Sequence, residues 1–116
     1  MHVYDRTTQR SVRLQVDTSP RLTNTYYVFQ VVWYDDTTIL LRLLNRVQTV
    51  EDIALCDAAA SGSCRLVTTN RAPMGWLEQG ALLPVPERNS ILQVRGSTQA
   101  AATATEMPAC PACLAC

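Results

Sequence analysis

Residues 26–33 read Tyr-Tyr-Val-Phe-Gln-Val-Val-Trp, and this stretch decides the fold class. Aromatic and β-branched side chains, which favour the pleated backbone of a strand, fill all of its positions except Gln30. Successive side chains of a strand point to opposite faces. Strict alternation therefore predicts one face with Tyr27, Phe29, Val31 and Trp33, and another with Val28, Gln30 and Val32. The predicted strand is apolar on both faces.

Three further segments with short links follow this stretch and predict an antiparallel meander with it. Asp35-Asp36 supplies the first turn, because both residues favour turns. The strands of the meander are then predicted at residues 26–33, 38–44, 50–57 and 64–69.

Residues 38–44 are ambiguous, because leucine also favours helices. Their short length and their position between two strand-like segments favour a strand. As a strand, this segment too is apolar on both faces. One face carries Ile39, Leu41 and Leu43, and the other carries Leu40 and Leu44.

The outer parts of the chain carry weaker signals. Alternation over residues 12–16 predicts a half-buried strand, and residues 90–94 predict another short strand. Prolines punctuate a loop-rich stretch from residue 70 onward, including Pro84 and Pro86. Residues 97–105 are an Ala/Thr/Ser/Gln tract that we interpret as a tail or linker.

The first two strands of the meander need cover on both sides, because an antiparallel sheet with one wet face would alternate cleanly. The rest of the chain is too polar and too interrupted to supply two covering layers. The chain therefore associates with copies of itself or is part of a larger fold of stacked sheets, such as a β-propeller. The second interpretation is favoured, since a lone propeller blade leaves apolar faces and unpaired edges.

Composition excludes several classes of protein. Ten basic residues balance ten acidic ones, whereas nucleic-acid-binding modules usually carry a basic excess. A hydrophobic content of 47% is too high for a disordered chain. Arg42 interrupts the longest aliphatic run, so we expect no membrane span, and the polar residues after Met1 predict no export signal.

The chain offers little for catalysis or metal binding. It lacks the Gly-X-Ser-X-Gly motif of α/β-hydrolases, and its single histidine, His2, is a poor candidate base at the terminus. The tail carries a Cys-X2-Cys-X2-Cys pattern that resembles part of a metal site, but no fourth ligand is near it. We therefore expect no catalytic residue, metal or cofactor, and an incidental role for Cys110, Cys113 and Cys116. Asp35-Asp36 is expected to be a solvated turn, Arg46 and Gln48 to be connector residues, and Trp33 and Trp76 to be core or interface residues.

A series of short matches resembles the amino-terminal β-propeller of the dipeptidyl peptidase IV family, which belongs with the prolyl-oligopeptidase-like serine peptidases. The matches are Tyr26-Tyr27 through Trp33, Leu44-Asn45-Arg46 with Gln48, Leu55-Cys56-Asp57, Ser61-Gly62 with Cys64, and Gly75-Trp76. Leu-Asn-Arg and the brief Cys-to-Cys loop are most similar to the dipeptidyl-peptidase-like branch. The resemblance covers about residues 3–96, is blurred at Pro84 and Pro86, and ends after Gly96.

The resemblance implies an all-β fold in which residues 1–96 form one propeller blade and part of its neighbours. Residues 97–116 are then a low-complexity, Cys-containing tail that we predict to be disordered. It also implies a disulfide between Cys56 and Cys64, which flank a short loop between two predicted antiparallel strands. Two reduced, buried cysteines in a cytosolic protein are the alternative. A disulfide would place the parent protein in an oxidising, extracellular or lumenal compartment.

Three hypotheses for function are open, and the resemblance implies the first two. In the first, the chain is scaffold from a membrane-anchored or secreted peptidase that releases amino-terminal dipeptides and whose Ser, His and Asp lie in a separate hydrolase domain. In the second, it comes from an inactive relative that acts as a potassium-channel partner. The third hypothesis is an independent secreted binding module. Expected partners of the parent are peptide substrates or a channel subunit, with a second copy in a homodimer.

Overall fold

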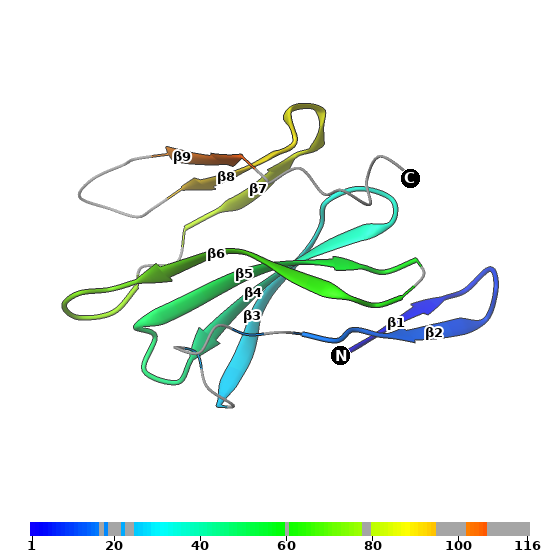
Figure 1. The fold of residues 1–116 in the computed structure, drawn as a ribbon, viewed down its shortest axis with the longest axis horizontal. Helices are drawn as coiled ribbons and strands as arrows, with labels where there is room; N and C mark the ends of the chain where they lie inside the picture. The colour runs from blue at the N-terminus through cyan, green and yellow to red at the C-terminus, as the bar shows by residue number, and fades with distance from the viewer. Residues whose placement is uncertain are drawn as a thin grey trace. The chain divides into compact units, whose positions relative to one another are not determined.

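A computed structural model describes residues 1–16, 18, 22, 25–59, 61–77, 80–94 and 102–106 (Figure 1). The chain divides into two compact units, Met1–Leu77 and Glu78–Cys116. The described elements are strands apart from one turn of 3-10 helix, which confirms the all-β prediction. No helix in this described part is long and apolar enough to cross a membrane.

The first unit is built on a four-stranded sheet with the order β3-β4-β5-β6. Its strands are β3 (Tyr26–Trp33), β4 (Thr38–Asn45), β5 (Val50–Asp57) and β6 (Cys64–Arg71), and each pairs antiparallel with the next. This is the predicted meander. Residues 38–45 are a strand and not a helix, because their neighbours on both sides provide complete backbone ladders.

The face assignment within β3 was wrong, because the strand contains a β-bulge. The register with β4 shifts between Val28 and Gln30, so Phe29 is an extra residue. A bulge reverses the alternation beyond it. Val28, Val31 and Trp33 consequently share one face, while Tyr27, Gln30 and Val32 share the other.

The two central strands are buried on both faces, as predicted for β4. We call the side with Ile39, Leu41, Leu43, Val50, Ala54 and Cys56 the front face. The rear face carries Leu40, Arg42, Leu44, Glu51, Ile53 and Leu55. Every one of these side chains is buried, including the charged pair on the rear face.

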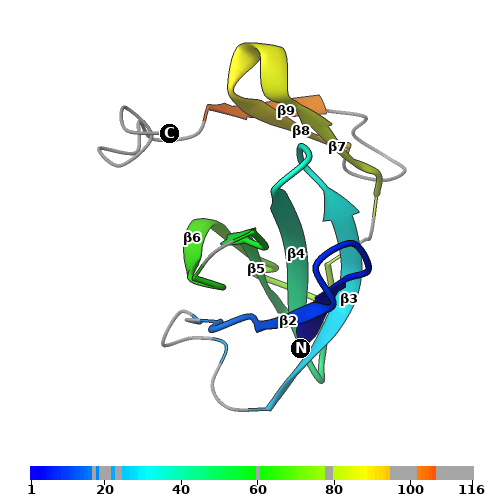
Figure 2. The ribbon, with the colours of Figure 1, turned by 90° about the vertical axis from the view of Figure 1, so that its right-hand side faces the viewer.

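The amino-terminal segment supplies cover for the front face. It begins with a hairpin of β1 (His2–Asp5) and β2 (Arg10–Arg13). Leu14 and Leu22 then join the buried front-face cluster, with Val3 and Val16 packed against it. The predicted strand at residues 12–16 is thus confirmed only in part, and β1 was not predicted. Figure 2 shows this hairpin and the neighbouring four-stranded sheet from the side.

The second unit is a three-stranded antiparallel sheet with the order β7-β8-β9. Its elements are β7 (Leu82–Val85), the 3-10 turn η1 (Pro86–Arg88), β8 (Ser90–Val94) and β9 (Ala102–Glu106). The strand predicted at residues 90–94 is confirmed. β7 was predicted as loop because of Pro84, but it is an edge strand, where proline is tolerated.

The prediction of a disordered tail at residues 97–116 was wrong for residues 102–106, which form β9. Its β-branched Thr103 and Thr105 suit a strand, and β8 offers a ladder to residues 102–106. Residues 107–116, with Cys110, Cys113 and Cys116, lie outside the described residues.

Candidate functional site

The disulfide Cys56–Cys64 joins the ends of β5 and β6, as expected from the resemblance. The two residues are direct cross-strand partners. The backbone N–H of Cys64 donates to the Gln15 carbonyl at 3.2 Å and so points away from β5. Such a non-hydrogen-bonded pair brings the two side chains closest together. Closing this short loop stabilises the fold by about 2.5 kcal/mol in the chain-entropy estimate.

The turn before Cys64 also anchors the amino-terminal segment. The Gln15 N–H donates to the Gly62 carbonyl at 2.7 Å, and Gln15 forms a parallel bridge with Ser63. Gly62 has a φ of 70°, and a Cβ there would overlap the carbonyl oxygen of Arg13. Glycine is required for both reasons. The disulfide and the hairpin cover therefore meet at one turn.

A buried polar network crosses the rear face through all four strands. Arg42 Nε lies 2.6 Å from Glu51 Oε1, and both side chains are almost inaccessible. Arg42 Nη1 donates to Gln30 Oε1 at 3.2 Å, while Asn70 Nδ2 donates to Glu51 Oε2 at 3.0 Å. Burial lowers the pKa of the Arg42 guanidinium below its ordinary value, and the charge of Glu51 opposes that shift.

This network is structural chemistry and not catalytic chemistry. Its charges are directed at each other and at two amides, with no nucleophile among them. A one-residue slip of β4 or β5 would move a charged group to the opposite face, and a slip of β3 or β6 would remove its amide partner, so the network favours one register of the sheet. The sequence pattern did not predict this network, because Arg42 stands out there only as an interruption of an aliphatic run. Its position on the same face as Leu40 and Leu44 was the available signal.

Asp35 and Gln48 lie in turns. Asp35 Oδ1 accepts hydrogen bonds from the Thr37 N–H at 2.9 Å and the Thr37 hydroxyl at 3.2 Å. Desolvation raises the pKa of Asp35, but the hydrogen bonds from Thr37 and Thr38 outweigh it, so the pKa is lowered. The prediction of a turn at Asp35-Asp36 is confirmed. In the β4–β5 turn, the Gln48 N–H donates to the Asn45 carbonyl, which agrees with a connector role for Gln48.

Trp33 and Trp76 are 55% and 70% exposed, so they do not lie in the core, and a role at an interface stays a prediction. His2 lies exposed in β1. No group of His, Cys, Asp and Glu side chains that could hold a metal ion occurs among the described residues.

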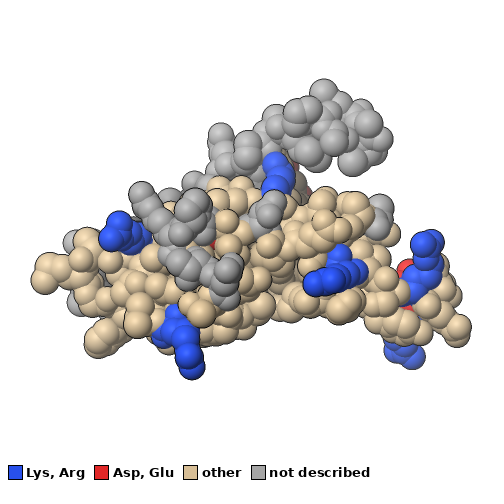
Figure 3. Space-filling model, turned by 60° about the horizontal axis from the view of Figure 1, so that its bottom comes forward, with Lys and Arg blue, Asp and Glu red and all other residues tan. Residues whose placement is uncertain are grey.

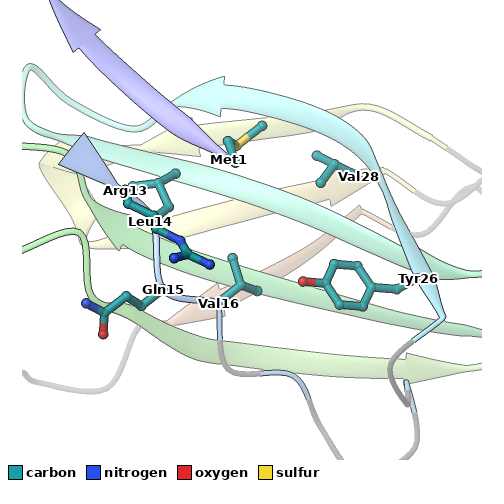
Figure 4. A pocket seen from close by; sticks show the side chains of 7 residues that line it. All are labelled: Met1, Arg13, Leu14, Gln15, Val16, Tyr26 and Val28. Carbon is teal, nitrogen blue, oxygen red and sulfur yellow. The ribbon is translucent and has the colours of Figure 1, made fainter. Parts of the chain in front are cut away.

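Hollows in the first unit lie where the amino-terminal hairpin meets the front face. One of about 470 Å³ is shown in Figure 4 and is lined by Met1, Arg13, Leu14, Gln15, Val16, Tyr26 and Val28. These residues offer no pairing of a nucleophile with a base. On the face shown in Figure 3, basic side chains are scattered among uncharged ones, unlike the continuous basic surface of a nucleic-acid interface.

Comparison with models of protein families gives a match over most of the chain. Residues 1–99 match the family model described as "Dipeptidyl peptidase IV (DPP IV) N-terminal region". No curated protein matches the chain significantly. The match covers the whole first unit and reaches past β8.

Proposed function

Because the chain belongs to the dipeptidyl peptidase IV N-terminal region family, we propose that it is a β-propeller segment of a larger dipeptidyl peptidase IV-like protein. The family match over residues 1–99 is the observation that carries this proposal. The sequential sheet β3–β6, with central strands buried on both faces, supports it, because a propeller blade packs between two neighbours.

In the parent, this segment has the role of scaffold. The reaction is the release of dipeptides from peptide amino termini, in which a serine attacks the carbonyl, a histidine takes its proton and an aspartate orients the histidine. Those groups belong to a hydrolase domain, and the propeller shapes the access of peptides to it. The Cys56–Cys64 disulfide supports an extracellular or lumenal location for the parent. The proposed parent acts on peptides as a homodimer.

An inactive, channel-associated parent is the competing proposal. The feature that favours it is Leu44-Asn45-Arg46, the tripeptide most similar to the dipeptidyl-peptidase-like branch. Asn45 has a local structural role, since its Oδ1 accepts from the N–H groups of Thr49 and Val50 at 2.8 and 3.1 Å. The decision between the two parents depends on the serine of the hydrolase motif.

The proposal is tested by sequencing the transcript on both sides of the region that encodes this chain. The full protein is then expressed. We expect further blades and a Gly-X-Ser-X-Gly motif, and release of p-nitroaniline from Gly-Pro and Ala-Pro anilides. The matched control changes the motif serine to alanine and should abolish release. A parent with further blades but an altered serine, and no release, supports the inactive branch. A transcript without further blades contradicts both.

A further inference from the structure

The amino-terminal hairpin carries more positive than negative charge. It contains Arg6, Arg10 and Arg13 but only one carboxylate, Asp5, whereas the whole chain is neutral. All three arginines are exposed, and none of them forms an ion pair with a carboxylate of the described residues. Their guanidinium groups are therefore available to an anionic ligand.

A hollow of about 690 Å³ lies between this hairpin and the β5–β6 turn. All four residues of β2 line it, including Arg10 and Arg13, and the turn contributes Ala58, Ala59 and Ser61. Both walls belong to the first unit and are joined by the backbone hydrogen bonds described above. The hollow is therefore formed by this chain alone, with a volume typical of ligand sites.

A second hollow, of about 490 Å³, adjoins the first, because both are lined by Asp5 and residues 58–59. It adds the third arginine, Arg6, and the aromatic side chains of Tyr4 and Trp33, which are 60% and 55% exposed. The two hollows thus present three guanidinium groups and two aromatic rings to one extended ligand.

This combination of side chains suits an acidic oligosaccharide. A guanidinium group donates paired hydrogen bonds to a sulfate or carboxylate group, and an exposed aromatic ring offers an apolar surface to the C–H face of a sugar. The hydroxyl groups of Thr8, Ser11 and Ser61 both donate and accept, and the carboxylates of Asp5 and Asp36 accept from sugar hydroxyls. An acidic peptide offers fewer hydroxyl donors and accounts less well for the two carboxylates.

We propose that the two hollows bind an acidic oligosaccharide, a function beyond the scaffold role proposed above. Its anionic groups, sulfate or carboxylate, bind Arg6, Arg10 and Arg13, and a sugar ring packs on Trp33. Since Trp33 is the last residue of β3, the site uses only that end of the strand. Acidic glycans surround cells, so the proposal draws on the extracellular location proposed for the parent.

Calorimetric titration of the expressed parent with hexasaccharides tests the proposal. Heparin hexasaccharide supplies sulfate groups, hyaluronan hexasaccharide supplies carboxylates alone, and maltohexaose is the neutral control. We expect one or both acidic sugars to bind more tightly than maltohexaose, with an affinity that falls as the salt concentration rises. The acidic sugar that binds more tightly identifies the anionic group.

Matched variants locate the site. Arg10→Gln should weaken binding about tenfold, because a hydrogen bond between charged groups is lost. Arg46→Gln removes the same charge at the other end of β5 and should change the affinity by less than about twofold. Trp33→Leu should also weaken binding, whereas Trp76→Leu removes an exposed ring that lines neither hollow and should not.

Equal losses in Arg10→Gln and Arg46→Gln, binding of hexaglutamate as tight as that of the acidic sugars, or no binding of either acidic sugar would overturn the proposal. Circular dichroism checks that each variant is folded, and Arg6→Gln provides a second test of an arginine. Dipeptide release is a separate readout. An inactive parent that binds the acidic sugar would refute the peptidase proposal and leave the glycan site intact.

Discussion

Strands β3 and β4 are neighbours with similar composition, but they differ in burial. Val31 and Leu41 are direct cross-strand partners on the front face, yet Leu41 is fully buried and Val31 is 47% exposed. Both strands are apolar on both sides. This difference is expected if β3 packs against further parts of the parent, as proposed above, whereas β4 is buried within the chain itself.

The largest expected effect comes from breaking the buried network of β4 and β5. Replacing Arg42 with leucine leaves the Glu51 carboxylate buried without its cation and should cost about 3–5 kcal/mol in unfolding free energy. Urea unfolding of the purified chain, followed by circular dichroism, measures this. The double variant Arg42→Leu/Glu51→Leu is the control and should recover most of the loss. A single variant as stable as the wild type would show that the pair does not hold the sheet.

The second-largest loss of stability is expected at the cross-strand pair Val31 and Leu41, and only at its buried member. Leu41→Ala removes buried methyl groups and should cost about 2–5 kcal/mol. Val31→Ala, one strand away in the same register, should change stability in the purified chain by less than about 0.5 kcal/mol. Equal losses at the two positions would show that β3 is already covered within the chain.

Removing the disulfide should have a smaller effect than Arg42→Leu and one at the lower end of the range expected for Leu41→Ala. The double variant Cys56→Ser/Cys64→Ser loses the cross-link and about 2.5 kcal/mol. Reduction of the wild type with dithiothreitol should lower the urea midpoint similarly and should leave the double variant unchanged. A midpoint insensitive to both treatments would contradict the stabilising role of this bond.

The smallest effect concerns the β3–β4 turn. The lowered pKa of Asp35 means that its folded form binds a proton less readily than its unfolded form, whose ordinary pKa is 3.8. Its stabilisation is therefore present above about pH 4 and fades as the pH falls through the folded pKa. Asp35→Asn should cost under about 1 kcal/mol at pH 7.

At pH 3 the difference between Asp35→Asn and the wild type should shrink, with Asp36→Asn as the control at both pH values. A difference that grows on acidification would reverse the assigned direction.

The sequence predicted the central sheet well, because its four strand-like segments are joined by short links with turn signals such as Asp35-Asp36 and Ser61-Gly62. The sequence did not predict the features that depend on contacts between segments far apart in the chain. The bulge at Phe29 inverts half of β3 without any local signal. The fit of Gly62 against the Arg13 carbonyl depends on a segment far away in the chain. Residues 82–85 were predicted as loop because of Pro84, since proline is acceptable in a strand only at the edge of a sheet, where β7 lies.

Among the site residues, the Cys56–Cys64 bond followed from the family resemblance and from the short loop between two strands. The Arg42–Glu51 pair did not, because its diagonal contact depends on the register of β4 and β5. The exposure of Trp33 could not be predicted either, since a tryptophan in an apolar strand is normally buried.

Hydrogen exchange of β3 and β5 tests most directly whether other parts of the parent protein cover β3. Mass spectrometry would follow peptides covering Val31 and Ile53 in the purified chain and in the expressed parent. We predict slow exchange around Ile53 in both proteins, and exchange around Val31 that is fast in the chain and slow in the parent. Equally slow exchange around Val31 in the two proteins would contradict the account.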